Sequence, residues 1–257
     1  MKTNYHTHTT RCQHAAGTDE AYVKAAVQAG FDVLGFADHA PWPFETGYVS
    51  GIRMTTDEWA DYRDSVLSLR QRYQGVIDVR LGLESEYFPR YRDHLLRLRD
   101  DGCEYLLLGQ HFSDTEEFYP YVGYSCRADD EVKQYADSVA EALTTGLFAY
   151  VAHPDLYMKP RREFDRVSME AADVICQAAR EAKVPMEYNL LGLLNELEGN
   201  PRGYPSRDFW AYIRKWEPEV ILGVDAHQPA HLTHQLLWDT GVKNVRDAGH
   251  RLIADWK

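Results

Sequence analysis

Short apolar runs alternate along this chain with longer segments in which apolar residues recur at a helical period. The runs predict strands and the longer segments predict helices. Thr18 is an N-cap candidate for the first helix, which Gly30 closes, and Ser206 is an N-cap candidate for a later one. The expected strands are 2–5, 32–37, 76–83, 104–108, 148–152, 186–189 and 220–224; the expected helices are 19–29, 55–73, 92–99, 129–144, 166–183 and 206–216, with a C-terminal helical region from 232–239.

About seven strands separated by helices indicate parallel strands joined by right-handed crossovers. A closed barrel and an open doubly wound sheet give similar patterns, so the pattern alone leaves this choice open. The length of 257 residues is common for one α/β barrel. We therefore expect a single domain over residues 1–257.

Composition narrows the class of protein. Apolar residues make up 44% and charged residues 26%, a balance typical of a globular protein with a sizeable core. The net charge of −12 argues against nucleic-acid binding through backbone electrostatics, although bound metal ions could still create a local anion site. The sequence shows neither a signal-peptide pattern nor an apolar run of about 18 residues, which predicts a cytoplasmic protein without membrane contact. Its four cysteines include no CxxC pair, as expected of reduced thiols.

Histidine and acidic residues follow nearly every expected strand. In a parallel barrel these strand ends lie on one face, where the βα loops build the active site. The site thus favours a barrel, with candidate metal ligands at the C-terminal ends of its strands. The nine candidates are His6, His8, His14, His39, Glu84, His111, His153, Asp225 and His227.

The spacing of these residues has a physical reason. Residues i and i+2 of a strand point to the same side, so His6 and His8 can bind one ion, as can Asp225 and His227. Imidazole and carboxylate ligands together suit zinc, manganese or iron. Nine candidates exceed the needs of one tetrahedral ion, which predicts two to three divalent ions with Glu84 as a bridge.

Each candidate has an ordinary explanation when taken alone. His-x-His near an N-terminus is often polar surface, His111 or His153 could be a satisfied buried histidine, and Glu84 could be a salt-bridge partner. Only their conjunction favours a metal site. The remaining histidines fall in helical or terminal segments, and we expect them to be surface residues: His94, His231, His234 and His250.

Six motifs carry a resemblance to a known family. They are HTHT at 6–9, ADH at 37–39, LESEY at 83–87, GQHF at 109–112, AHPD at 152–155 and DAH at 225–227. In this order they resemble the polymerase and histidinol phosphatase (PHP) family over nearly the whole chain. The resemblance implies a distorted, TIM-barrel-like fold of seven β/α units and a trinuclear metal site. Gln110 stands where relatives often carry serine, which changes no ligand.

The resemblance also implies which residues share an ion. His6, His8, Glu84 and Asp225 would hold the first ion; His14, His39 and His227 would hold the second; Glu84, His111 and His153 would hold the third.

Length and motifs resemble most the single-domain histidinol-phosphate phosphatases of this family. The segments ADHAPWPF and YNLLGL, followed by NPRGYPSRDFW, support that branch less strongly. The branch implies hydrolysis of L-histidinol phosphate to L-histidinol and phosphate, a step of histidine biosynthesis. A hydroxide between two ions would be the nucleophile, because metal binding lowers the pKa of water towards about 7. Asp225, Glu84 and His227 are the candidate catalytic residues, and the identity of the general acid is left open.

Loop residues are candidates for holding such a small phosphorylated substrate. Guanidinium groups suit phosphate, and aromatic rings could pack against an imidazole while a glutamate pairs with an ammonium. Taken alone, each cation is better explained as a solvated surface charge, while loop packing explains the aromatic residues, and a solvated turn the glutamates, as well as a substrate contact does. The cationic candidates are Lys159, Arg161, Arg162, Arg202 and Arg207; the others are Trp42, Phe44, Phe112, Glu116 and Glu117.

Other functions stay open. A PHP-type phosphoesterase could act on another small phosphate, a nucleotide or a phosphodiester, including nucleic acid as a nuclease. An amidohydrolase also begins with His-x-His on a barrel, although it usually needs a bridging lysine or glutamate and a terminal aspartate without the Asp-x-His pair found at Asp225 and His227. A non-catalytic metal-binding protein is a third class, for which nine ligands look excessive. The sequence does not indicate an oligomeric state.

Overall fold

The computed structural model describes residues 1–161 and 163–256, so that Arg162 lies outside the described residues. Residue contacts divide the chain into two compact units. Unit 1 comprises Met1–Leu107 and Gly223–Gln235, and unit 2 comprises Leu108–Leu222 and Leu236–Lys257. The organisation as a single domain stays a prediction.

Unit 1 contains the first strands of a parallel sheet in chain order. The register runs from Val33 opposite Asp78 to His39 opposite Glu84, so two expected ligands from neighbouring strands end side by side. The strands are β1 (Thr3–Asn4), β2 (Val33–His39), β3 (Asp78–Ser85) and β4 (Tyr105–Leu108), of which Leu108 is counted with unit 2.

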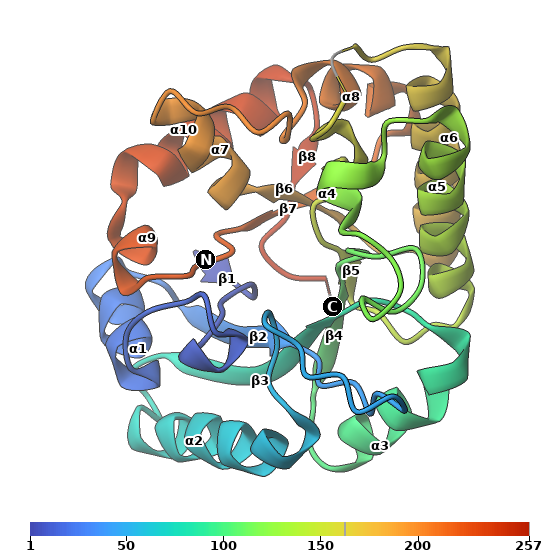
Figure 1. Ribbon diagram of the computed structural model, residues 1–257. Helices are drawn as coiled ribbons and strands as arrows, with labels where there is room; N and C mark the ends of the chain where they lie inside the picture. Colours follow the sequence, from blue (N-terminus) through green and yellow to red (C-terminus); the bar gives the residue numbers. More distant parts are fainter. Residues whose placement is uncertain (162, 257) are drawn as a thin grey trace. The chain divides into compact units, whose positions relative to one another are not determined.

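Helices α1 and α2 cover the outer face of this part of the sheet (Figure 1). The Thr18 side chain accepts a hydrogen bond from the Ala21 amide, which confirms it as the N-cap of α1. Gly30, at φ 71°, then turns the chain into β2 in the left-handed region that favours glycine. The helices of unit 1 are α1 (Asp19–Gln28), α2 (Trp59–Arg72), α3 (Arg92–Asp100) and α9 (Pro229–Thr233), and a 3-10 turn (Thr56–Glu58) precedes α2.

Tyr105 of β4 fills the interior of unit 1. Its hydroxyl lies 2.8 Å from the Tyr5 carbonyl oxygen and 2.9 Å from that of Phe36, within donating distance of both. A Cβ on Gly82 would come within 2.3 Å of the Tyr105 ring, so only glycine leaves room for it. One phenol thus bonds to the residue that follows β1 and to the middle of β2, upstream of the candidate ligands of both segments.

Unit 2 pairs β5 with β6 and β7 with β8, both in parallel. Helices α5 and α6 pack against each other (Figure 1). The strands are β5 (Tyr150–Val151), β6 (Met186–Asn189), β7 (Glu219–Gly223) and β8 (Arg251–Leu252); the helices are α4 (Val122–Ser125), α5 (Asp129–Thr144), α6 (Arg166–Ala182), α7 (Leu190–Leu197), α8 (Arg207–Tyr212) and α10 (Gln235–Asp247).

The structure corrects several expected elements. The described residues form eight strands rather than about seven, because β8 is too short to show an alternating pattern. The pattern also missed α7, which follows β6 directly and is too rich in leucine to show a polar face. Ser206 is the expected N-cap of α8, but the helix gives way to a 3-10 turn at Ile213–Trp216. None of the helices in the described ranges is both long and apolar enough to span a membrane.

Candidate metal centre

Two short segments that lie far apart in sequence pair through their backbones in unit 1. Thr7 and Ala226 form an isolated parallel bridge. The His8 amide donates to the Ala226 carbonyl at 2.9 Å, and the Ala226 amide donates to the His6 carbonyl at 3.2 Å. This pairing brings the predicted pair His6 and His8 to the segment that carries Asp225 and His227.

The side chains of the first predicted set converge. His6 Nε2 lies 3.2 Å from His8 Nε2, and Asp225 Oδ1 lies 3.5 Å and 3.1 Å from these two nitrogens. Asp225 adopts φ 51°, a left-handed conformation that is costly for a residue with a side chain and often found at functional sites. Buried nitrogens and a carboxylate oxygen aimed at one point suit a divalent cation.

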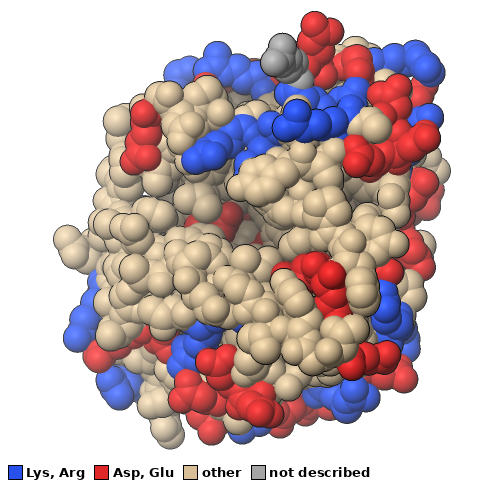
Figure 2. Space-filling view, in the orientation of Figure 1, with Lys and Arg blue, Asp and Glu red and all other residues tan. Residues whose placement is uncertain are grey.

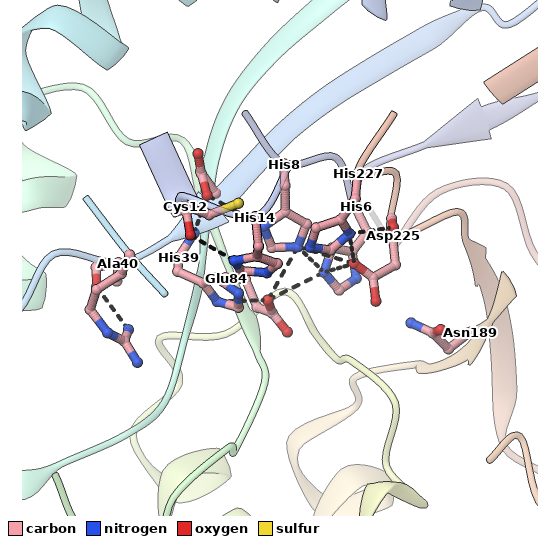
Figure 3. A network of polar contacts seen from close by, with 12 residues as sticks. His6, His8, Cys12, His14, His39, Ala40, Glu84, Asn189, Asp225 and His227 are labelled. Carbon is pink, nitrogen blue, oxygen red and sulfur yellow. Dashed lines mark hydrogen bonds and ion pairs between the residues drawn. The ribbon is translucent and has the colours of Figure 1, made fainter. Parts of the chain in front are cut away.

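Glu84 ends β3 beside this group (Figure 3). Its Oε2 lies 3.4 Å from His6 Nε2, 3.5 Å from His8 Nε2 and 3.1 Å from His39 Nδ1. One carboxylate oxygen therefore faces imidazoles from the first predicted set and from the second. Glu84 is placed as a bridging ligand would be.

The second predicted set also gathers in unit 1. The ligand atoms of His14, His39 and His227 all lie within 4.8 Å of one another. His14 Nδ1 donates to the Cys12 carbonyl at 2.6 Å, and His227 Nδ1 donates to the Asp225 carbonyl at 3.0 Å. A nitrogen that donates carries the proton, so both rings present the lone pair of Nε2 to an ion.

Sequence reasoning missed Asp38, which is fully buried beneath the site. Its Oδ1 lies 3.3 Å from His8 Nδ1, and its Oδ2 accepts hydrogen bonds from the Thr9 amide and hydroxyl. A carboxylate behind a metal-binding histidine fixes the tautomer and orientation of the ring. Its place next to His39 in the ADH motif was the only signal in the sequence.

Burial and charge act against each other in this group. Burial alone would lower the pKa of His8, but hydrogen bonds with Asp225 and Asp38 outweigh it and raise that pKa well above the usual value. Burial alone would raise the pKa of Asp225, but the neighbouring His6, His8 and His227 hold it well below the usual value. Burial lowers the pKa of His227 to about 3. Asp225 is thus ionised and His227 neutral at pH 7, as metal ligands must be, whereas a bound ion would have to displace the proton that His8 carries.

The third predicted set is divided between the units. Glu84 belongs to unit 1, whereas His111 and His153 belong to unit 2, where their ring centroids lie 5.1 Å apart. His153 adopts φ 29°, and both histidines are buried. A third ion with these ligands stays a prediction.

Three of the four remaining histidines are not the exposed surface residues we expected. His250 is buried, with Nε2 donating to the Trp210 carbonyl at 2.7 Å. His231 is half-buried, and its Nδ1 accepts a hydrogen bond from the His227 amide at 3.3 Å. His94 is half-buried and donates to the Pro41 carbonyl at 2.7 Å, and His234 is exposed as expected. Sequence alone did not show these backbone partners.

The predicted cationic contacts differ in their surroundings within unit 2. Lys159 Nζ lies 4.8 Å from the ring centroids of both Tyr121 and Tyr124. The guanidinium of Arg161 forms ion pairs with Asp129 and Asp165, so it is already engaged within unit 2. Arg207 pairs with Glu196 at 2.6 Å and Arg202 is exposed, whereas Arg162 lies outside the described residues.

The predicted ring-packing residues are mostly packed among other aromatics. Trp42 is 3% exposed, donates from Nε1 to Glu86 Oε2 at 3.0 Å and stacks on Tyr91. Its environment is that of a core side chain, with Glu86 held in turn by the buried Arg53. Phe44 is half-buried against Tyr48, Phe112 is buried against Tyr121, and Glu116 and Glu117 are half-buried. A substrate contact by any of these residues stays a prediction.

Parallel strands that end in convergent imidazoles and carboxylates define an α/β protein with a candidate polynuclear metal centre. Residues 4–190 match the PHP domain, and the chain therefore belongs to the PHP family.

Named relatives agree with this assignment. The chain is 29% identical over 259 residues to a protein of Deinococcus radiodurans named "Probable histidinol-phosphatase", with 96% of this chain and 94% of that protein covered. It is 24% identical over 262 residues to the histidinol-phosphatase of Bacillus subtilis, with 89% and 94% covered.

A solved structure shows the same fold. The histidinol phosphate phosphatase of Lactococcus lactis, crystallised with zinc, L-histidinol and phosphate, matches with a TM-score of 0.75 at 15% identity. The match covers 98% of this chain and 95% of that chain. The predicted fold class, an α/β fold of the PHP type, is confirmed.

Proposed function

We propose that this protein is a metal-dependent phosphomonoesterase that hydrolyses L-histidinol phosphate to L-histidinol and phosphate. The observation that carries the proposal is the convergence of His6, His8, Glu84 and Asp225 in unit 1. One relative is named a probable histidinol-phosphatase and the other a histidinol-phosphatase, and the solved relative holds zinc, L-histidinol and phosphate. A role in histidine biosynthesis, in the cytoplasm and without a nucleic-acid partner, is part of the same proposal.

We propose two to three divalent ions, which could be zinc, manganese or iron. His6, His8, Glu84 and Asp225 would hold the first ion. His14, His39 and His227 would hold the second, and Glu84, His111 and His153 would hold the third. Bound ions would supply an activated water at neutral pH and offset the charge of the phosphate.

Residues of the chain would orient the metal-binding His8 and transfer the proton during hydrolysis. Asp38 would keep His8 in one orientation through the 3.3 Å contact with Nδ1. Asp225 is ionised, with Oδ1 facing His6 and His8. Its Oδ2 would accept a proton from the attacking water and return it to the leaving alkoxide. The neutral His227 is the alternative group for this transfer.

Lys159 and Arg202 are the cationic residues that we favour for binding the phosphate. Burial lowers the pKa of Lys159, and the positive charge of Arg202 lowers it further, so the two cations repel each other within unit 2. An anion between them would relieve this repulsion. Figure 2 shows Lys and Arg side chains gathered around α8, on the same unit.

The local backbone supports this pairing. Asp155 Oδ2 accepts a hydrogen bond from the Ser206 amide at 2.6 Å, which ties the loop after α7 to the AHPD motif. A Cβ on Gly203 would lie 2.7 Å from the Met158 carbonyl oxygen and 3.0 Å from Lys159 Cα. Gly203 therefore allows the loop that carries Arg202 to approach the turn that carries Lys159.

Steady-state assays with added zinc or manganese test the proposal. A site built for the polar groups of one substrate discriminates against analogues without them, so kcat/KM for histidinol phosphate should exceed that for p-nitrophenyl phosphate by at least about 100-fold. Comparable values, or preference for a sugar phosphate or nucleotide, would reject this substrate but keep a phosphatase. Preference for a phosphodiester would indicate a nuclease-type enzyme, and turnover of an N-acyl amino acid an amidohydrolase. Metal uptake without turnover of any of these would leave a metal-binding protein.

A further inference from the structure

Cys12 is the cysteine that lies within the metal centre. It ends the 3-10 turn Thr10–Cys12 that follows the His-x-His motif, and its side chain is fully buried. The other thiols have different surroundings: Cys103 Sγ donates to the Tyr105 carbonyl, Cys126 Sγ donates to the Glu131 carbonyl, and Cys176 lies on α6. The sulfur of Cys12, by contrast, lies among imidazole nitrogens of the candidate metal centre.

The sulfur of Cys12 belongs to a group of possible ligand atoms. Its Sγ, an imidazole nitrogen of His8 and one of His227 all lie within 4.8 Å of one another. The imidazole set of His14, His39 and His227 meets the same limit. Ligands about 2.0 to 2.3 Å from a tetrahedral ion lie about 3.3 to 3.8 Å from each other, so a modest contraction would complete either group.

The backbone of Cys12 orients one histidine of the second imidazole set. Its carbonyl accepts the hydrogen bond from His14 Nδ1 at 2.6 Å (Figure 3). The same residue thus orients one histidine through its carbonyl and presents sulfur to two others. A sulfur–metal bond would couple the position of His14 to the ion.

We propose that Cys12 is a sulfur ligand of the thiophilic divalent ion that His227 holds, the second ion of the proposed function, with His8 as its neighbour on the side of the first ion. The thiol releases its proton to solvent when the sulfur–metal bond forms. Thiolate favours zinc over manganese, so Cys12 gives the centre a preference that imidazoles and carboxylates alone do not provide. The proposal goes beyond the phosphatase activity, because it requires a metal at these histidines and no particular substrate.

Cobalt provides the direct test, because a thiolate bound to Co²⁺ gives a charge-transfer absorption in the near ultraviolet. Metal-free protein is titrated with Co²⁺, and absorption and cobalt content are measured together. We expect the band in the wild type and in Cys176→Ser, the matched control, and its loss in Cys12→Ser. The band must also appear in Cys103→Ser and Cys126→Ser, which assigns it to Cys12 even if Cys12→Ser fails to fold.

Two results would overturn the proposal: no such band in the wild type, or a band that persists in Cys12→Ser or disappears in one of the other serine variants. Zinc X-ray absorption of the wild type checks the same point, since it should show sulfur at about 2.3 Å. Cobalt uptake with phosphatase activity but without the sulfur band would refute the role of Cys12 alone. The band without activity on any phosphate ester would instead refute the proposed function.

Discussion

Thr7 and Ala226 pair as an isolated parallel bridge, and the candidate metal ligands stand on both sides of it. His6 and His8 flank Thr7, while Asp225 and His227 flank Ala226. Since alternate residues of an extended chain share a side, this pairing directs His6 and His8 toward the segment that carries Asp225 and His227, where the left-handed backbone of Asp225 turns its carboxylate toward them. The geometry of the site is therefore fixed by the backbone before any ion binds.

Glu84→Gln should lose metal and activity together. Glu84 faces His6, His8 and His39 within 3.5 Å, so a neutral amide there removes a charge that two ions would share. Losing an outer partner of a ligand costs about 10- to 100-fold, and losing a bridging ligand should lower kcat/KM by at least about 100-fold. Metal analysis and kinetics on the same sample measure both effects.

His94→Asn is the control for this substitution. It removes the hydrogen bond to the Pro41 carbonyl, which should lower the free energy of unfolding by about 1 kcal/mol while metal content stays unchanged. If Glu84→Gln retained full metal content and turnover, Glu84 would not be a bridge.

Protein reconstituted with zinc, manganese or iron should contain two to three ions per chain. The two ligand sets of unit 1 provide for two ions, and the predicted set of Glu84, His111 and His153 would provide for a third. Elemental analysis after removal of loosely bound metal gives the number. A value clearly below two would contradict a polynuclear centre.

The part of this site that sequence could predict follows from parallel topology. His39 and Glu84 lie opposite each other at the ends of neighbouring strands. The recurrence of histidine and acidic residues after the expected strands can be seen in the sequence itself. The same holds for the i and i+2 pairs. These signals are local in sequence, and the topology of a parallel sheet brings them together.

The missed features depend on contacts between segments far apart in sequence. Asp38 looks like part of a motif until its contact with His8, 30 residues away, is seen. The close approach of Gly203 to Met158 and Lys159 brings two loops together, which no periodicity encodes. Trp42 was an aromatic residue in an expected loop, yet its partners Glu86 and Tyr91 bury it.

Asp38→Asn should weaken metal binding without unfolding the protein. The amide is isosteric but no longer carries the charge that holds His8 Nδ1, so affinity for zinc should fall about 10- to 100-fold. Competition with a chelating dye measures the affinity. Asp57→Asn, at an exposed position in the turn before α2, is the matched control and should leave it unchanged. Equal affinities in the two variants would show that Asp38 does not orient the ligand.

His250 should make stability depend on pH. Burial lowers the pKa of His250, so the folded protein keeps it neutral while the unfolded chain binds a proton near its ordinary pKa of about 6.5. This contribution is therefore present above about pH 6.5 and is lost as pH falls toward the lowered value. Urea unfolding between pH 5 and 8 should show a steeper loss of stability in the wild type than in His250→Gln. Parallel curves for the two proteins would exclude the effect.

Gly203→Ala should raise KM for the phosphate ester and leave metal content intact. Gly203 has φ 80°, and its Cβ would collide with the Met158 carbonyl and Lys159 Cα, so the turn that carries Lys159 must shift. Gly199→Ala is a close control, because Gly199 has φ 78° in the same loop but no atom within 4 Å of an added Cβ. Both variants carry the cost of a left-handed alanine, about 1 kcal/mol, and only Gly203→Ala adds the collision.

Since Lys159 and Arg202 are proposed to bind phosphate, the KM of Gly203→Ala should exceed that of Gly199→Ala by about tenfold, the equivalent of 1.4 kcal/mol. Inorganic phosphate should weaken as an inhibitor in parallel. Equal KM values in the two alanine variants would mean that the approach of this loop to Lys159 does not serve phosphate binding.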